Sequence, residues 1–308
     1  MGTPLAAVPT FKRIIEDGHE VVGVYTQPDR PSGRGNKIRF SPVKQYALEN
    51  GIEVLQPLKI RTAEALETFK SHGADAAVVV AYGRILPESF LTAFPHGAIN
   101  VHFSLLPKYR GAAPVNWAIA NGETKTGVTT MKMDAGLDTG DILLQNETEI
   151  ESEETAPELL TRLSFVGAEL LSETLSHINE LAAQKQAETE ATFAPILKRE
   201  DGLINWELSA SQINNRIRGF QPFPSSYSNH NEQRVTIWKA KITEVTTSNR
   251  NLPGTVLSLE EKLIAVACEG NTVLLIEEIQ PEGKRRMPAA DFINGSRLKV
   301  GDRFGERD

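Results

Sequence analysis

The chain has 308 residues, of which 40% are hydrophobic and 24% are charged, a composition that excludes fibrous and disordered proteins. A formal net charge of −7 argues against a general polyanion-binding protein, and a single cysteine, Cys268, excludes an internal disulfide and a thiolate zinc site. The sequence has neither an apolar stretch of membrane-spanning length nor a signal-peptide pattern, so we expect a cytoplasmic protein.

The first part of the chain alternates short apolar segments with amphipathic ones. The apolar segments, rich in β-branched residues, predict strands near residues 21–26, 52–56, 76–82 and 98–102. The amphipathic segments predict helices over residues 5–17, 41–50, 62–72, 87–94 and 155–181. Strands that alternate with helices predict parallel βαβ units, and therefore an α/β fold with a doubly wound sheet.

The pattern starts with a helix, although a doubly wound domain normally starts with a strand. Gly2, Thr3 and Pro4 lead directly into the helix predicted over residues 5–17. We therefore expect either a sheet with one strand fewer or a first strand formed by residues upstream of Met1.

The second part of the chain has a different rhythm. Residues 182–191 are polar without an apolar face, which is typical of a linker. A helix is predicted over residues 209–218, and short strands over 234–240, 254–258, 263–268 and 272–276. Strands at this spacing predict a small, OB-like β-barrel. We expect domains at residues 1–181 and 199–308, joined by a linker at 182–198.

Two basic segments run against the acidic net charge. Residues 28–44 contain five basic residues and one acidic residue, and residues 284–307 contain seven basic and three acidic ones. Such segments favour either local contact with a nucleic acid or merely solvated faces. The prolines and glycines of residues 28–44 predict a long, mobile loop with Arg34 at its tip, in which helix and strand are both disfavoured.

Polar side chains gather where predicted strands end. Asn100 and His102 alternate with apolar residues, so both point to one face of a strand near its carboxyl end, where α/β sheets bind ligands. An amide beside an imidazole can stabilise a developing oxyanion, although a structural histidine is about equally consistent with the pattern. The segment from Tyr82 to Pro87 follows another strand and is expected to line the same crevice.

The segment 133–141 is the second polar group, with two glycines and three carboxylates, among them Asp138. It predicts a tight turn between strands; a magnesium site is weakly supported because no phosphate-binding loop accompanies it. A nucleotide-binding glycine loop and a serine-hydrolase elbow are both absent.

These segments resemble a known family. NVHFSLLPKYRGAAP from Asn100 and MDAGLDTGDIL from Met133 are similar to the 10-formyltetrahydrofolate-dependent formyltransferases. TQPDRPSGRG, AYGRILP and GKRRMPAADFINGSRLKVGDR resemble the branch of the family that acts on methionyl-tRNA. The resemblance covers nearly the whole chain and implies a Rossmann-like formyltransferase domain followed by a barrel domain that binds tRNA.

The resemblance also implies roles for individual residues. The catalytic residues would be Asn100, His102 and Asp138, with an ionised Asp138 favouring the imidazolium form of His102. The positions that match the family's folate-binding segments are Ser104, Leu105, Leu106, Pro107, Ile85 and Leu86. Arg34 and Lys37 match the loop that approaches the tRNA.

The implied co-substrate is 10-formyltetrahydrofolate, the implied partner is initiator methionyl-tRNA, and no metal is implied. A monomer is expected. Two alternatives stay open: formyl transfer to another amine, such as an amino-sugar nucleotide, and a tRNA-binding protein whose α/β domain is catalytically dead.

Overall fold

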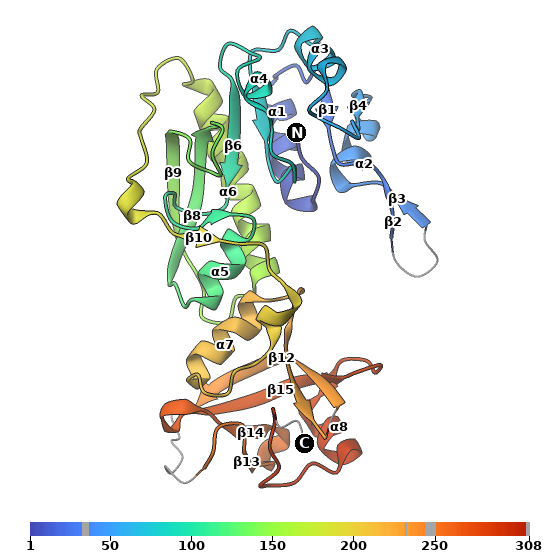
Figure 1. Cartoon of the computed structure of the whole chain (residues 1–308), viewed down its shortest axis with the longest axis vertical. Coiled ribbons are helices and arrows are strands. Elements are labelled where there is room, and N and C mark those ends of the chain that lie inside the picture. Colours follow the sequence, from blue (N-terminus) through green and yellow to red (C-terminus); the bar gives the residue numbers. More distant parts are fainter. Residues whose placement is uncertain (33–36, 232, 244–250, 306–308) are drawn as a thin grey trace. The chain divides into compact units, whose positions relative to one another are not determined.

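The computed structural model describes residues 1–32, 37–231, 233–243 and 251–305, and it divides into two compact units (Figure 1). Unit 1 comprises Met1–Pro114, Lys125–Glu149 and Leu160–Ala194, and unit 2 comprises Val115–Thr124, Ile150–Leu159 and Pro195–Asp308. Most of the segment predicted to be a linker, residues 182–194, therefore belongs to unit 1. The predicted domain limits themselves remain a prediction.

The elements of the first 194 residues follow the predicted alternation. The helices are α1 (Val8–Glu16), α2 (Pro42–Glu49), α3 (Ala63–Ser71), α4 (Glu88–Leu91), α5 (Pro114–Ala120) and α6 (Ala156–Ser176). The strands are β1 (Val24–Tyr25), β2 (Arg30–Ser32), β3 (Lys37–Arg39), β4 (Val54–Leu55), β5 (Ala77–Val79), β6 (Ala98–His102), β7 (Arg110–Gly111), β8 (Lys125–Lys132), β9 (Ile142–Glu149) and β10 (Phe193–Ala194). A short 3-10 turn, Leu5–Ala7, precedes α1.

The main sheet of unit 1 has the strand order β5-β6-β8-β9. β5 and β6 are parallel, as predicted, but β8 runs antiparallel to both β6 and β9. The antiparallel pairing of β8 with β9 arises because the turn at residues 133–141 joins them, with no crossover helix between them. The predicted turn between strands is therefore confirmed, whereas a wholly parallel sheet is not.

The start of the chain lies between two strands. Gly2 forms a parallel bridge with Val80, and the Gly2 amide donates to the Tyr25 carbonyl at 2.9 Å. The Val80 amide in turn donates to the Met1 carbonyl at 2.9 Å. These first residues thus connect the β1–β4 pair to the main sheet, although no strand was predicted before the first helix.

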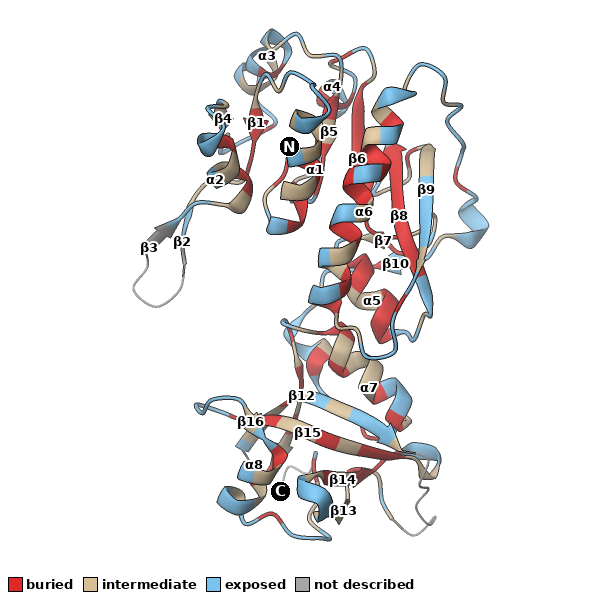
Figure 2. Cartoon of the chain, turned by 180° about the vertical axis from the view of Figure 1, so that it is seen from behind, coloured by how far each residue is buried: buried red, intermediate tan, exposed pale blue. Residues whose placement is uncertain are grey.

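Helix α6 packs on the strands that carry the candidate site. A Cβ placed at Gly167 of α6 would lie 2.8 Å from Val101 Cγ1 and 3.3 Å from Val128 Cγ1. The missing side chain therefore allows α6 to approach β6 and β8 closely. All five residues of β6 are buried, and Figure 2 shows β6 and most of β8 as continuous buried strands.

The basic segment 28–44 differs from its prediction as an irregular loop. β2 and β3 form an antiparallel pair in which Arg30 lies opposite Arg39. A proline, Pro31, is tolerated there because a two-stranded ribbon leaves one side of each strand without a ladder partner. Arg34, the expected tip residue, lies outside the described residues.

Unit 2 contains the predicted barrel domain. Its elements after residue 194 are α7 (Ala210–Gly219), β11 (Ser226–His230), β12 (Gln233–Thr243), β13 (Val256–Ser258), β14 (Ile264–Ala267), β15 (Val273–Pro281), β16 (Met287–Pro288) and α8 (Ala289–Ser296), with several 3-10 turns. The strand order is β11-β12-β15-β14-β13, with β16 beside β15.

The segment 302–305 joins the two edges of this curled sheet. The Phe304 amide donates to Gly254 at one edge, and the Gly305 amide donates to Asn229 of β11 at the other, both at 2.9 Å. Apolar side chains from the strands and from α7 fill the interior, among them Ile237, Leu274 and Ile217. The predicted fold class, an α/β domain followed by a small barrel-like domain, is confirmed.

Candidate functional site

Strand β6 presents two polar side chains from the middle of unit 1. Asn100 and His102 are two residues apart and so point to the same side of the sheet. Pairing with β8 fixes them, because Asn100 lies opposite Met131 and His102 opposite Thr129. Their side chains are 8% and 6% exposed. The sequence prediction for these two residues is therefore reproduced in their placement.

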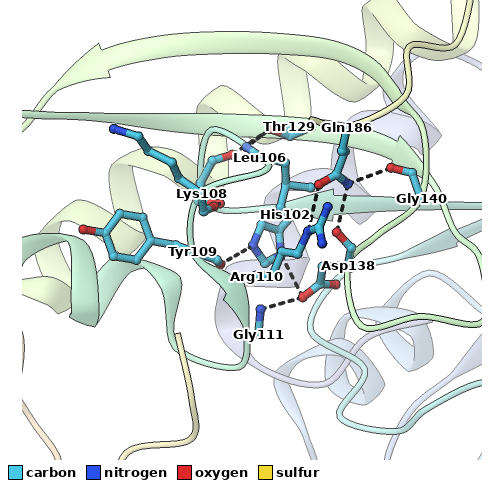
Figure 3. Close-up of polar contacts among 11 residues, drawn as sticks. His102, Leu106, Lys108, Tyr109, Arg110, Gly111, Thr129, Asp138, Gly140 and Gln186 are labelled. Atoms are coloured by element: carbon cyan, nitrogen blue, oxygen red, sulfur yellow. Dashed lines mark hydrogen bonds and ion pairs between the residues drawn. The ribbon is translucent and has the colours of Figure 1, made fainter. Parts of the chain in front are cut away.

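The two ring nitrogens of His102 face different oxygen atoms (Figure 3). Nε2 lies 3.0 Å from the carbonyl oxygen of Tyr109. Because a carbonyl only accepts, Nε2 carries a hydrogen and donates it. Nδ1 lies 3.7 Å from Asp138 Oδ2, beyond hydrogen-bond distance but within ion-pair range. The Nδ1 edge is consequently the one that can exchange a proton or contact a ligand.

The carboxylate of Asp138 comes from the turn between β8 and β9. Its backbone has a φ of 54°, in the left-handed region, and its side chain is 14% exposed. The same oxygen that faces His102, Oδ2, accepts a hydrogen bond from the Gly111 amide at 2.8 Å. The fold thus brings Asp138 beside His102, as the resemblance implied.

Asn100 differs from its two neighbours in its hydrogen bonding. Within the described residues, the side-chain amide of Asn100 has no hydrogen-bond partner. A buried amide normally finds a partner, so an unused one on the strand face that carries His102 is suited to a ligand. It supplies two N–H donors and one acceptor.

Three further residues surround this group, and the sequence reasoning missed them as site residues. Gln186 donates through Nε2 to the backbone carbonyls of Asp138 and Gly140, at 2.9 and 2.7 Å. Arg110 donates to Gln186 and, through two nitrogens, to Glu188. Gln186 and Glu188 belong to the predicted linker, where nothing distinguishes them from the other polar residues.

The ion pair between Arg110 and Glu188 perturbs both groups. The hydrogen bond that Arg110 donates to Glu188 raises the pKa of Arg110, and the same bond lowers the pKa of Glu188. Arg110 is only 2% exposed, whereas Glu188 is 72% exposed. The buried guanidinium therefore has its counter-ion at the surface.

The segment from Ser104 to Pro107, predicted to contact a folate, is held by side-chain hydrogen bonds. The Ser104 hydroxyl donates to the Lys108 carbonyl at 2.7 Å, and the Leu106 amide donates to Thr129 Oγ1 at 3.1 Å. Ser104 and Leu106 are buried, while Leu105 and Pro107 are half-buried. The accessible surface of this segment therefore comes mainly from Leu105 and Pro107.

The other predicted folate positions line a surface pocket of about 430 Å³. Ile85 is 68% exposed and Leu86 is 4% exposed, so Ile85 offers the larger accessible apolar surface. Its lining includes Arg61, Thr62, Leu66, Pro87, Phe90 and Ala135. Ala135 belongs to the same turn as Asp138, so the pocket adjoins the loop that carries the carboxylate.

The base of the β2–β3 ribbon is anchored near this pocket. Lys44 Nζ donates to Asp29 Oδ2 at 2.5 Å, and this bond lowers the pKa of Asp29. Gln27 donates to the Tyr82 carbonyl at 2.9 Å and accepts from Arg84 at 3.1 Å. The ribbon is thus attached to the loop that carries Ile85. Lys37 is the first residue of β3.

Within the described ranges, no group of three or more histidine, cysteine, aspartate or glutamate residues is placed to hold a metal ion. The described part of the chain also has no helix of the length and apolarity needed to cross a membrane.

Comparison with known proteins gives two family matches. Residues 1–175 match the formyl transferase family, and residues 196–297 match the formyl transferase C-terminal domain. A methionyl-tRNA formyltransferase of Solibacter usitatus is 49% identical over 99% of this chain and 97% of the relative. Another, from Alkaliphilus oremlandii, is 47% identical over 99% of this chain and 98% of its own length.

Solved structures support the fold. An N-formyltransferase from Helicobacter canadensis, in complex with folinic acid and dTDP-3-aminofucose, has a TM-score of 0.66 at 21% identity and covers 89% of this chain and 96% of its own. A methionyl-tRNA formyltransferase from Clostridium thermocellum has a TM-score of 0.53 at 22% identity, covering 76% and 92%. At these identities the likeness concerns the fold alone.

Proposed function

Since the chain belongs to the formyl transferase family, we propose that it transfers the formyl group of 10-formyltetrahydrofolate to the α-amino group of initiator methionyl-tRNA. Full-length similarity to methionyl-tRNA formyltransferases at 43–49% identity supports this substrate pair. The observation that carries the chemistry is the contact between His102 and Asp138, with Asn100 two residues before His102 on the same face of β6. The product is formylmethionyl-tRNA, which serves translation initiation.

Two groups in the site stabilise the negative charge that the reaction creates. When the amine attacks the formyl carbon, a new C–N bond forms and the formyl oxygen becomes an oxyanion. The unused amide of Asn100 donates to that oxygen. His102 donates from its Nδ1 edge when it is protonated on both nitrogens, because its Nε2 hydrogen is already donated to the Tyr109 carbonyl.

The carboxylate of Asp138 serves the proton transfer. Attack leaves a positively charged amine, and collapse of the intermediate breaks the bond to N10 of the folate, which then takes up a proton. Asp138 lies 3.7 Å from His102 Nδ1, so it stabilises positive charge there and can order the water that carries the proton from the amine to N10. The formyl group passes directly from N10 to the amine and the proton passes from the amine to N10, so no covalent enzyme intermediate is needed.

The folate is proposed to occupy the pocket beside the Asp138 loop. The apolar side chains of Ile85 and Leu86 would contact the pterin ring, and the segment from Ser104 to Pro107 would border the folate on the way to Asn100. The dimensions support this, because the pocket's volume of about 430 Å³ falls in the range typical of small-molecule sites.

The tRNA is proposed to contact both units of a monomeric, cytoplasmic enzyme. The β2–β3 ribbon carries basic residues, and Arg34 and Lys37 are proposed to meet the acceptor end. The barrel-like domain, residues 199–308, would bind elsewhere on the tRNA through its basic segment 284–307.

Replacing Arg34 tests the proposed contact with the tRNA. We expect Arg34→Ala to lower kcat/KM for initiator methionyl-tRNA, to reduce discrimination against elongator tRNA, and to leave folate binding unchanged. A simple phosphate contact would instead weaken binding of all tRNAs alike. It would also reduce the slope of log affinity against log salt concentration by about one. Unchanged tRNA kinetics would remove Arg34 from the proposal.

A formylation assay tests the function as a whole. The purified chain is incubated with 10-formyltetrahydrofolate and methionyl-tRNA, and formylmethionine is measured. A parallel reaction offers an amino-sugar nucleotide, the substrate of the alternative enzymatic hypothesis. Formylmethionine formation supports the proposal; formylation of the sugar alone supports the alternative. tRNA binding without any formyl transfer would indicate a catalytically dead domain.

A further inference from the structure

The Arg110 guanidinium is a buried cation beside the catalytic group. Its Nε donates to Gln186 Oε1 at 3.0 Å. Its Nη1 and Nη2 donate to the two carboxylate oxygens of Glu188 at 3.0 and 2.8 Å. A bidentate bond of this kind fixes the plane of the guanidinium, and the 2% exposure of Arg110 limits the access of water to its nitrogens.

Gln186 transmits this fixed orientation to the Asp138 loop. Its amide oxygen accepts from Arg110, while its Nε2 donates to the carbonyls of Asp138 and Gly140 (Figure 3). Because both ends of the amide are engaged, the side chain cannot turn over without breaking bonds. It therefore fastens the loop on both sides of Thr139.

The backbone on either side of Arg110 contacts the catalytic side chains directly. The Tyr109 carbonyl accepts the hydrogen of His102 Nε2, and the Gly111 amide donates to Asp138 Oδ2. Arg110 itself lies between these two peptide groups in β7. A displacement of Arg110 would therefore move the partners of both His102 and Asp138.

The loop needs such external support. Asp138 has a φ of 54°, a left-handed conformation that costs energy for a residue with a side chain. A residue with such a backbone conformation keeps its position only when several contacts with the surrounding structure hold it. The hydrogen bonds from Gln186 and from Gly111 are two such restraints.

We propose that Arg110, Gln186 and Glu188 form a positioning network that sets the catalytic geometry of Asp138 and His102 during formyl transfer. The network rests on the proposed function, since its effect is measured on that reaction. None of the three residues is required to touch either substrate. Their contribution should therefore appear in kcat rather than in substrate binding.

Gln186→Leu is the main test, with Gln184→Leu as its control. Gln184 is an exposed residue of the same segment. Because a misplacement of about 1 Å can cost on the order of 100-fold in rate, we expect Gln186→Leu to lower kcat by about 10- to 100-fold. KM for both substrates should stay within about twofold, and Gln184→Leu should retain wild-type kinetics.

A double variant separates positioning from general damage. If Gln186 acts through Asp138, adding Gln186→Leu to Asp138→Asn should cost little further activity. The kcat of the double variant should lie within about threefold of the kcat of Asp138→Asn alone. Losses that multiply in the double variant would overturn the proposal. So would a wild-type kcat in Gln186→Leu, or an effect confined to KM.

A surface variant keeps the test decisive if Gln186→Leu fails to fold. Glu188 is 72% exposed, so Glu188→Ala should fold, and we expect a loss in kcat of about three- to tenfold. Glu190→Ala, in the same 3-10 turn, is the matched control and should be unaffected. Equal rates for both variants would contradict the network. A wild-type chain without formyltransferase activity would contradict the proposed function and, with it, this inference.

Discussion

Replacing Asp138 with asparagine removes one negative charge and little else. Oδ2 of Asp138 both accepts from the Gly111 amide at 2.8 Å and lies 3.7 Å from His102 Nδ1. An asparagine that keeps its amide oxygen at this position retains the bond to Gly111. The hydrogen bond from Gln186 is also retained, because it is made to the backbone carbonyl of Asp138. Asp138→Asn therefore isolates the electrostatic contribution.

The expected size of the effect follows from the distance. Two unit charges 3.7 Å apart interact by about 4 kcal/mol at an effective dielectric constant of about 20. Both side chains are largely buried, so salt screens the pair weakly. If the full interaction is used when His102 carries positive charge, kcat falls by about 1,000-fold. KM for both substrates should change little, because neither ground state carries that charge.

Single-turnover formylation of methionyl-tRNA measures this loss directly. Asp134→Asn is the matched control in the same turn, since the exposed Asp134 accepts hydrogen bonds from Gly136 and Thr139. An asparagine oxygen can accept both bonds, so the control should stay within about threefold of the wild type. A kcat for Asp138→Asn close to the wild-type value, or an equal loss in the control, would refute the electrostatic role.

Three further predictions concern single residues. Asn100→Ala removes an oxyanion donor and should lower kcat by about 100- to 1,000-fold, with unchanged thermal stability; a smaller loss in the same assay would exclude that role. Gly111→Ala should lower Tm in a thermal melt, because Gly111 has a φ of +127° and an added Cβ would lie 2.5 Å from the Ala194 carbonyl oxygen. Burial raises the pKa of Cys268 to about 12, so Ellman's reagent at pH 8 should react only after unfolding. Because the pKa of the folded thiol exceeds the usual value of 9.0, the thiol's contribution to stability is complete below pH 9 and is lost as the pH rises towards 12. Denaturant titrations of Cys268→Ala and of the wild type at several pH values measure this loss.

Local sequence patterns predicted the part of the site that lies on one strand. Alternation of polar and apolar residues placed Asn100 and His102 on one face, and β6 has the predicted bounds, Ala98–His102. The two glycines near Asp138 predicted a turn, and the turn is present. These features depend on neighbours in the sequence, which is why residues alone sufficed. The distance between Asp138 and His102, in contrast, was implied only by family resemblance.

The supporting residues could not be predicted because their partners are distant in the sequence. Arg110 and Gln186 are 76 residues apart, and Gln186 stands in a polar segment that resembles any linker. A buried guanidinium is recognised only when its surroundings are known. The antiparallel course of β8 was missed for a related reason, since strand direction follows from tertiary pairing and not from composition.

The topology of the sheet explains why the Asp138 loop is fastened from outside. The Met133 amide donates to the Ala98 carbonyl, so the loop leaves the sheet at the amino end of β6. Asp138, however, faces His102 at the carboxyl end of the same strand. Four residue steps of a strand cover about 13 Å, a distance that the loop can span only by running back over the sheet. Such a loop forms no ladder with β6, and Gln186 supplies part of the restraint that a ladder would have given.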